Sequence, residues 1–167
     1  MKTPLLRLLA LFSFFSGLVS AQPAADTTVY ELRTYTATPG NLDKLLARFR
    51  DHTLRIFEKH GMKNIGYSVP TDKADGAGEK LVYLIAHTSR EAAKQSWKNF
   101  SADPEWKDVS AKSQVGGKIV AKVESIFLAA TDFSPPVAKY QGAPRLFELR
   151  TYTTPAGKIA ALDARFR

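Results

Sequence analysis

Runs of β-branched and aromatic residues alternate along this chain with segments whose apolar residues recur at every third or fourth position. This pattern predicts a mixture of strands and helices. The first run, residues 28–36, predicts a strand with two faces, because successive side chains point to opposite sides. One face carries Tyr30, Leu32 and Thr34, and the other carries Val29, Glu31, Arg33 and Tyr35. We expect the face with Tyr30 and Leu32 to lie under the helices.

An amphipathic helix is predicted next, over residues 39–60. Apolar residues recur from Leu42 onward at the spacing of one helix face, with charged residues between them. Thr38 can cap the helix, Pro39 suits its first turn, and Gly61 suits its end.

The remaining elements complete a six-element order of strand, helix, strand, strand, helix and strand. Strands are expected over 63–69, 81–87 and 118–129, a loop over 70–79, and helical segments from Ser89 and from Asp103-Pro104 to Gly116-Gly117. This order predicts an α+β fold, a ferredoxin-like split βαββαβ sandwich with a four-stranded antiparallel sheet and helices on one face. The strands carry large apolar residues at both parities, so the uncovered face would be apolar and would need a partner.

The chain also contains an internal repeat. Residues 30–50 and 147–167 are identical at 12 of 21 positions when they are aligned without a gap. We therefore expect the start of a second copy of the same unit, which would be poorly ordered or docked on the open sheet face of the first. The predicted organisation is a leader over 1–21, a lead-in over 22–28, a domain over 29–131, a proline-rich linker over 132–144 and an incomplete second domain over 145–167.

The first 21 residues have the features of a cleavable signal peptide. Lys2 and Arg7 precede the apolar run 8–19, and Val19-Ser20-Ala21 is a small-residue cleavage site, which places the cut after Ala21. The apolar run is shorter than the roughly 20 residues that span a bilayer, so no membrane span is expected after cleavage. We predict a periplasmic or secreted protein, and the absence of cysteine excludes a lipoprotein.

Charge and composition narrow the function classes. The whole chain has a net charge of +8, and without the predicted leader 22 basic residues face 16 acidic ones. These charges are interspersed, without the basic stripe and interleaved aromatics that nucleic-acid binding requires, so no nucleic-acid partner is expected. The chain has no cysteine, no HExxH and no convincing ligand spacing, so neither a metal nor a cofactor is predicted.

Several short motifs resemble those of the NIPSNAP family, which belongs to the dimeric α/β-barrel group of ferredoxin-like folds. The resemblance covers residues 29–134. It rests on Tyr30-Glu31-Leu32-Arg33-Thr34-Tyr35, Pro39-Gly40, His60-Gly61, Gly66-Tyr67, Asp103-Pro104-Glu105-Trp106 and Thr131-Asp132-Phe133-Ser134. It implies a barrel of two such units, within one chain or in a homodimer. It implies no particular reaction: related barrels include cofactor-free monooxygenases and haem-handling enzymes, and none of their motifs is matched here.

The candidate site residues lie on the first strand. Glu31, Arg33 and Tyr35 share the face that we expect to be turned toward the barrel lumen, and His87, on the parity of Tyr83, is a candidate to join them. One interpretation is the polar floor of a ligand pocket, with Glu31 as a base and Arg33 binding an anionic group. The other, which the pattern favours, is a structural ion pair that fixes the register of the partner sheet.

Other residues with functional potential are more simply explained as structural. His52 and His60 lie on the first helix, and Trp97 and Trp106 have the spacing of core residues. The sequence therefore predicts a module that binds a small molecule or a protein partner through a two-unit barrel. The alternatives are a cofactor-independent oxygenase or isomerase acting in the barrel lumen, and a pure assembly module.

Overall fold

The protein is described by a computed structural model that covers residues 27–137, 142–143 and 145–167. The predicted leader and most of the predicted lead-in lie outside the described residues. The strands are β1 (Val29–Ala37), β2 (Lys63–Ser68), β3 (Lys80–His87) and β4 (Val120–Ala129). The helical elements are α1 (Leu42–Arg48), η1 (Phe49–Thr53), α2 (Leu54–Lys59), η2 (Lys73–Asp75), α3 (Arg90–Ala102), α4 (Pro104–Ser113) and α5 (Ile159–Asp163).

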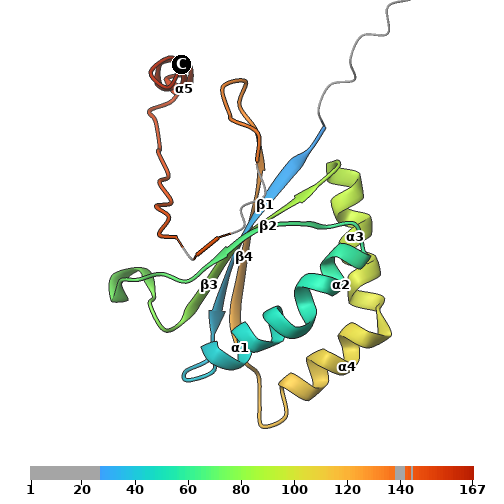
Figure 1. Ribbon diagram of the computed structural model, residues 1–167. Helices are drawn as coiled ribbons and strands as arrows, with labels where there is room; N and C mark the ends of the chain where they lie inside the picture. The colour runs from blue at the N-terminus through green and yellow to red at the C-terminus, as the bar shows by residue number, and fades with distance from the viewer. Residues whose placement is uncertain (1–26, 138–141, 144) are drawn as a thin grey trace, which may run out of the picture.

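The four strands form one antiparallel sheet in the order β2-β3-β1-β4, and the helices α1 to α4 gather on one side of it (Figure 1). This is the predicted ferredoxin-like α+β architecture. β1 lies inside the sheet, with Glu31 opposite Ile85 of β3 and opposite Phe127 of β4. Because directly opposed residues share a face of the sheet, this register decides which side chains can meet.

The first helix differs from the prediction at its start. It begins at Leu42 rather than at Pro39, since Gly40 has a φ of +74°, which a right-handed helix does not accommodate. Thr38 does not cap it either; its hydroxyl instead donates a hydrogen bond to the carbonyl of Lys118 at 2.7 Å. The helix then continues through a π-helical turn, η1, before α2 ends at Lys59.

The other two helices begin as their sequences predict. Ser89 caps α3, its hydroxyl accepting a hydrogen bond from the amide of Ala92 at 3.0 Å. Asp103 caps α4, and its carboxylate accepts from the amides of Glu105 and Trp106 at 2.8 and 3.2 Å. These caps fix where α3 and α4 begin.

The core lies between the sheet and the helices. Phe49 and Phe57 from the helices pack against Tyr83 of β3, with ring centroids 5.2 and 6.1 Å apart. Tyr67 of β2 stacks on the same Tyr83 ring at 5.2 Å, and Tyr35 of β1 reaches it at 5.4 Å. Burial of this aromatic cluster is a major favourable contribution to folding.

The two faces of β1 are reversed relative to the prediction. Glu31 and Tyr35 point toward the helices: Glu31 is 1% exposed and Tyr35 packs edge-to-face on Phe49. Tyr30 and Leu32 point to the uncovered face instead, because they oppose the alternate residues of β3 and β4. The polar face tolerates burial since its charged groups satisfy one another, as described below.

The second copy does not dock on the sheet. Leu146, Phe147 and Leu149 are exposed, and the extended part of this copy pairs with no strand among the described residues. Its helix α5 is followed by Phe166, whose ring stacks on Phe133 at 6.3 Å. In Figure 1 this segment lies apart from the helices that cover the domain.

Candidate functional site

The carboxylate of Glu31 is the centre of a buried polar cluster. Its Oε1 accepts hydrogen bonds from Arg33 Nη1 at 2.5 Å and from Ser125 Oγ at 2.6 Å. Its Oε2 accepts from Trp97 Nε1 at 2.7 Å and lies 3.1 Å from His87 Nε2. A carboxylate has about four acceptor positions, so these partners occupy all of its capacity.

Four different elements bring this cluster together. Glu31 and Arg33 lie two residues apart on β1 and therefore share its helix-facing side. Ser125 is opposite Arg33 on β4, and His87 is the last residue of β3. Trp97 reaches down from α3.

The surroundings of Glu31 keep it ionised. Burial alone would raise its pKa, but the hydrogen bonds from its four partners outweigh burial and lower the pKa to about 2. The pKa of Arg33 is raised, because the interactions with Tyr83, Tyr35 and Glu31 outweigh the effect of its burial. A carboxylate with so low a pKa and no free acceptor position is a poor proton acceptor, so this arrangement favours a structural role for Glu31 over the role of a base.

Arg33 and Tyr35 extend the cluster along β1. The Arg33 guanidinium lies 4.2 Å from the centroid of the Trp97 ring, and its Nη2 donates to the Tyr35 hydroxyl at 3.4 Å. Its Nε is buried without a hydrogen-bond partner. The structure thus brings all four predicted site residues together. Among these four, Tyr35 contacts only Arg33. The structure unites them under the helices of their own domain, so the pair does not set the register of a partner sheet.

His87, like Arg33, retains a buried polar atom that has no hydrogen-bond partner. Its side chain is fully buried, and its Nε2 faces the ionised Glu31. The hydrogen of a neutral imidazole therefore lies on Nε2, where it is donated to the carboxylate. Its other ring nitrogen, Nδ1, is buried and has no hydrogen-bond partner.

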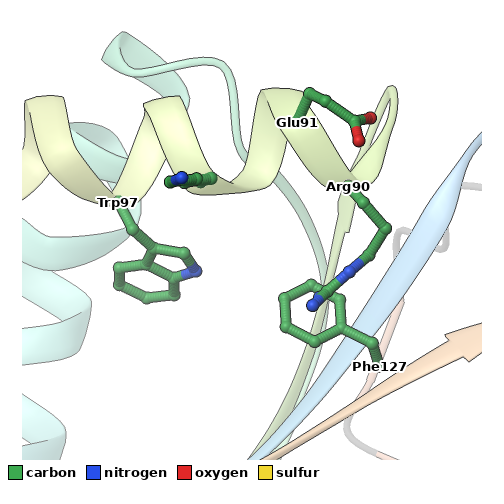
Figure 2. A pocket seen from close by; sticks show the side chains of 5 residues that line it. Arg90, Glu91, Trp97 and Phe127 are labelled. Atoms are coloured by element: carbon green, nitrogen blue, oxygen red, sulfur yellow. The ribbon is translucent and has the colours of Figure 1, made fainter.

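A surface cleft opens beside this cluster, between α3 and β4 (Figure 2). Its volume is about 510 Å3, and its lining residues are Arg90, Glu91, Lys94, Trp97 and Phe127. The Arg90 guanidinium lies over the Phe127 ring at 3.3 Å from the centroid, as Figure 2 shows. Trp97 belongs to both the cleft and the cluster, and thus connects them.

Sequence reasoning missed Ser125 and Arg90, and it assigned Trp97 to the core. The position of Trp97 two turns into α3 gives no sign that its indole N–H meets a carboxylate on β1. Ser125 alternates with its strand neighbours, but the sequence does not show which parity of the strand faces the helices, so it gave no signal of a buried partner.

The two helical histidines have different positions. His60 Nε2 lies 2.7 Å from Asp103 Oδ2, which ties the end of α2 to the start of α4 and is a structural contact. His52 lines a separate groove between the helices. Within residues 27–137, 142–143 and 145–167, no group of His, Cys, Asp and Glu could hold a metal ion. No helix in that part of the chain is long and apolar enough to cross a membrane.

The antiparallel sheet, the helices on one face and the polar cluster between them define an α+β domain of the ferredoxin-like class. A comparison with protein families adds the family: the NIPSNAP family model matches residues 30–135. The chain belongs to the NIPSNAP family. A comparison with the curated proteins finds no match.

Solved structures agree with this assignment at the level of fold. An uncharacterized NIPSNAP-like domain protein from Burkholderia xenovorans is 20% identical, with a TM-score of 0.57 over 74% of this chain and 97% of that chain. A NIPSNAP family protein with unknown function from Agrobacterium tumefaciens is 22% identical, with a TM-score of 0.57 over 66% and 95%. SnoaB, a cofactor-independent oxygenase from Streptomyces nogalater, is 11% identical over 64% and 95%, and its TM-score of 0.43 carries no functional argument.

Proposed function

We propose that this NIPSNAP domain binds a small molecule in the cleft between α3 and β4. The observation that carries the proposal is the shared position of Trp97, which lines the cleft and also donates to the buried Glu31. A ligand on the indole ring would therefore lie against a rigid wall, because the polar cluster fixes the ring's orientation. Pre-positioned aromatic walls are a general feature of ligand pockets.

The chemistry of the cleft favours a planar or apolar ligand with one negative charge. Trp97 and Phe127 provide aromatic surface, and Arg90 and Lys94 outnumber the single acidic residue, Glu91. Arg90 already lies over the Phe127 ring, so an anion placed there would meet a cation that is held in place. The volume of about 510 Å3 is within the range of small-molecule sites.

We also propose that the uncovered face of the sheet packs on a second NIPSNAP-like unit, in the same chain or in a homodimer. This face carries Tyr30, Leu32, Leu84, Ile126 and Leu128. Ile126 is 58% exposed and Leu128 is 42% exposed, so water contacts a continuous apolar strip. A second unit would present the same strip, as a two-fold symmetric interface requires.

Ligand binding is tested by native mass spectrometry of the purified full chain, which should reveal a bound mass that denaturation releases. In the double variant Arg90→Ala/Lys94→Ala this mass should be lost, whereas in the control Lys98→Ala it should remain. All three positions lie on the exposed side of α3, so the fold should be unaffected. Retention of the mass by the double variant, or its absence from the wild type, would contradict the cleft proposal.

Pairing of two units is tested by sedimentation velocity of wild type and Ile126→Asp. Ile126 is largely exposed, so the variant should fold, but a charge in the apolar strip should shift a dimer to monomers. Val115→Asp is a matched control, because Val115 is 81% exposed and lies after α4, away from the sheet. A wild type that is monomeric at all concentrations, or an Ile126→Asp variant that pairs normally, would refute the homodimer.

The second candidate function is a cofactor-independent oxygenase or isomerase. The observation that favours it is the unpartnered Nδ1 of His87, which would act as the base while Glu31 holds Nε2. Both reactions begin with the removal of a proton from an activated carbon. Deuterium uptake by a panel of cyclic ketones in D2O, followed by NMR, should be faster with wild type than with His87→Gln. Equal rates would reject this function.

Export is the remaining part of the proposal. We propose that residues 1–21 are a leader and that the mature protein is periplasmic or secreted. N-terminal sequencing of the protein expressed in a bacterial host should then begin at Gln22. Recovery of the intact N-terminus from the soluble cell interior would contradict it.

A further inference from the structure

Arg48 is a buried cation with few partners. It is 7% exposed and stands at the end of α1. Its Nη1 donates to Ser113 Oγ at 3.2 Å, and its guanidinium lies 5.2 Å from the centroid of the Trp106 ring. Its Nε has no hydrogen-bond partner, and no carboxylate among the described residues pairs with it.

The contrast with Arg33 shows what is missing at Arg48. Both guanidinium groups are buried and both stack on a tryptophan, but Arg33 has Glu31 as its counter-ion. Burial lowers the pKa of Arg48, and no carboxylate is present to oppose that effect. A buried arginine stays charged, so it needs an anion or several hydrogen bonds to offset the loss of water.

Arg48 lines a groove between α1–η1 and α4. The groove has a volume of about 460 Å3 and is lined by Lys44, Ala47, Arg48, Asp51, His52, Asp108, Val109, Lys112, Ser113 and Val115. Lys112 Nζ pairs with Asp108 Oδ2 at 2.8 Å, so these two charges offset each other. Among the remaining formal charges of the lining, Lys44 and Arg48 are positive and Asp51 is negative, which leaves a net charge of about +1.

The backbone beside Arg48 is also unusual. The π-helical turn η1 begins at the next residue, and Thr53 Oγ1 donates to the Arg48 carbonyl at 3.1 Å. Short π-helical turns within α-helices are frequent at functional sites. Two residues of this turn, Asp51 and His52, line the groove, so the turn contributes directly to its wall.

We infer that this groove binds a monocarboxylate with an apolar body. The carboxylate pairs with the Arg48 guanidinium, and its single charge matches the net charge of the lining. Its apolar part lies on Val109 and on Val115, which is 81% exposed; both line the groove. Asp51, whose charge has no ion-pair partner among the lining residues, disfavours a dianion such as phosphate by repulsion. This site is separate from the cleft beside Trp97.

The test is an NMR titration of the 15N-labelled full chain with hexanoate at constant ionic strength. The Arg48 Nε–H and the Trp106 indole N–H should shift saturably, while the Trp97 indole N–H should not. Hexanamide, the neutral matched compound, should cause no saturable shift, and inorganic phosphate should bind at least tenfold more weakly than hexanoate. No saturable shift with hexanoate, equal shifts with hexanamide, or tighter binding of phosphate would each overturn the inference.

Two variants assign the site. Arg48→Met should abolish the hexanoate response, whereas Arg50→Met, at an exposed position of the adjoining turn η1, should leave it unchanged. If Arg48→Met does not fold, the variant Val115→Asp tests the site instead. This exposed position tolerates a charge, and the new carboxylate should weaken hexanoate binding at least fivefold. Val69→Asp is its control, at an apolar position that is 45% exposed and outside the groove. Unchanged binding to Val115→Asp would refute the inference.

Discussion

The substitution Glu31→Gln tests whether the buried carboxylate stabilises the domain. The side chain keeps its shape but loses its charge, and its amide hydrogens now face donors such as Trp97 Nε1 or Arg33 Nη1. The folded protein holds the pKa of Glu31 at about 2, below its ordinary value of 4.5. A difference of about 2.5 in pKa corresponds to about 3 kcal/mol of stability at pH 7. Glu31→Gln should therefore unfold at a clearly lower urea concentration.

The stability difference between wild type and Glu31→Gln should also depend on pH. The folded pKa is depressed, so the stabilisation is complete above pH 4.5 and is lost as the pH falls toward 2. The difference between wild type and Glu31→Gln should thus shrink from about 3 kcal/mol at pH 7 to about 1.4 kcal/mol at pH 3. Urea titrations followed by tryptophan fluorescence at both pH values measure it.

The internal repeat supplies a matched control, Glu148→Gln. Arg150 Nε donates to Glu148 Oε1 at 2.6 Å, which repeats the pairing of Glu31 with Arg33. Here, however, the Glu148 side chain is 68% exposed and the Arg150 side chain is 63% exposed. An exposed pair contributes about 0–1 kcal/mol, so this variant should unfold close to wild type. Equal effects of Glu148→Gln and Glu31→Gln, or a loss for Glu31→Gln that does not change with pH, would refute the reasoning.

Three further substitutions test other parts of the fold. Trp97→Phe removes a donor to Glu31 and should lower the free energy of unfolding by about 1.5–3 kcal/mol in urea titrations, with a smaller difference in acid. Asp103→Ala removes the α4 cap and should lower the Tm measured by circular dichroism. The folded protein lowers the pKa of Asp103 below its ordinary value of 3.8, so the difference in Tm between wild type and variant should shrink as the pH falls below 3.8. Gly76→Ala should cost about 1–2 kcal/mol, because residue 76 has a φ of +100°, whereas Gly66→Ala, in open space at an ordinary φ, should cost less than half as much.

The fold followed from the sequence because its signals are local. The order of elements, the starts of the two helices at Ser89 and at Asp103-Pro104, and the antiparallel sheet were all predicted correctly. The orientation of the two β1 faces was predicted wrongly. The alternation of side chains shows that Glu31 and Tyr30 lie on opposite sides of the strand, but it does not show which side the helices cover. Which face of β1 is covered depends on hydrogen-bond donors to Glu31 that come from other elements, such as Trp97 of α3 and Ser125 of β4.

The candidate site could also be predicted only in part from the sequence. The sequence identified Glu31, Arg33, Tyr35 and His87 as a group, because three of them share one strand face and the fourth, on the parity of Tyr83, was a candidate to face the same pocket. It did not identify Ser125, and it gave no sign of the π-helical turn after Arg48, which changes the helix by a single residue and leaves the apolar periodicity intact.

The ion pair of the second copy has a consequence for how the domain folds. Arg150 and Glu148 pair in an extended segment that has no neighbouring strand among the described residues. The contact is therefore local and does not require a finished sheet. By analogy, Glu31 and Arg33 can meet before β3 and β4 close on β1, so the two charges leave water together rather than one at a time. A paired carboxylate is less costly to bury than a lone one, so we expect this early pairing to lower the barrier to sheet closure. Mutation of Arg33 would then slow folding itself.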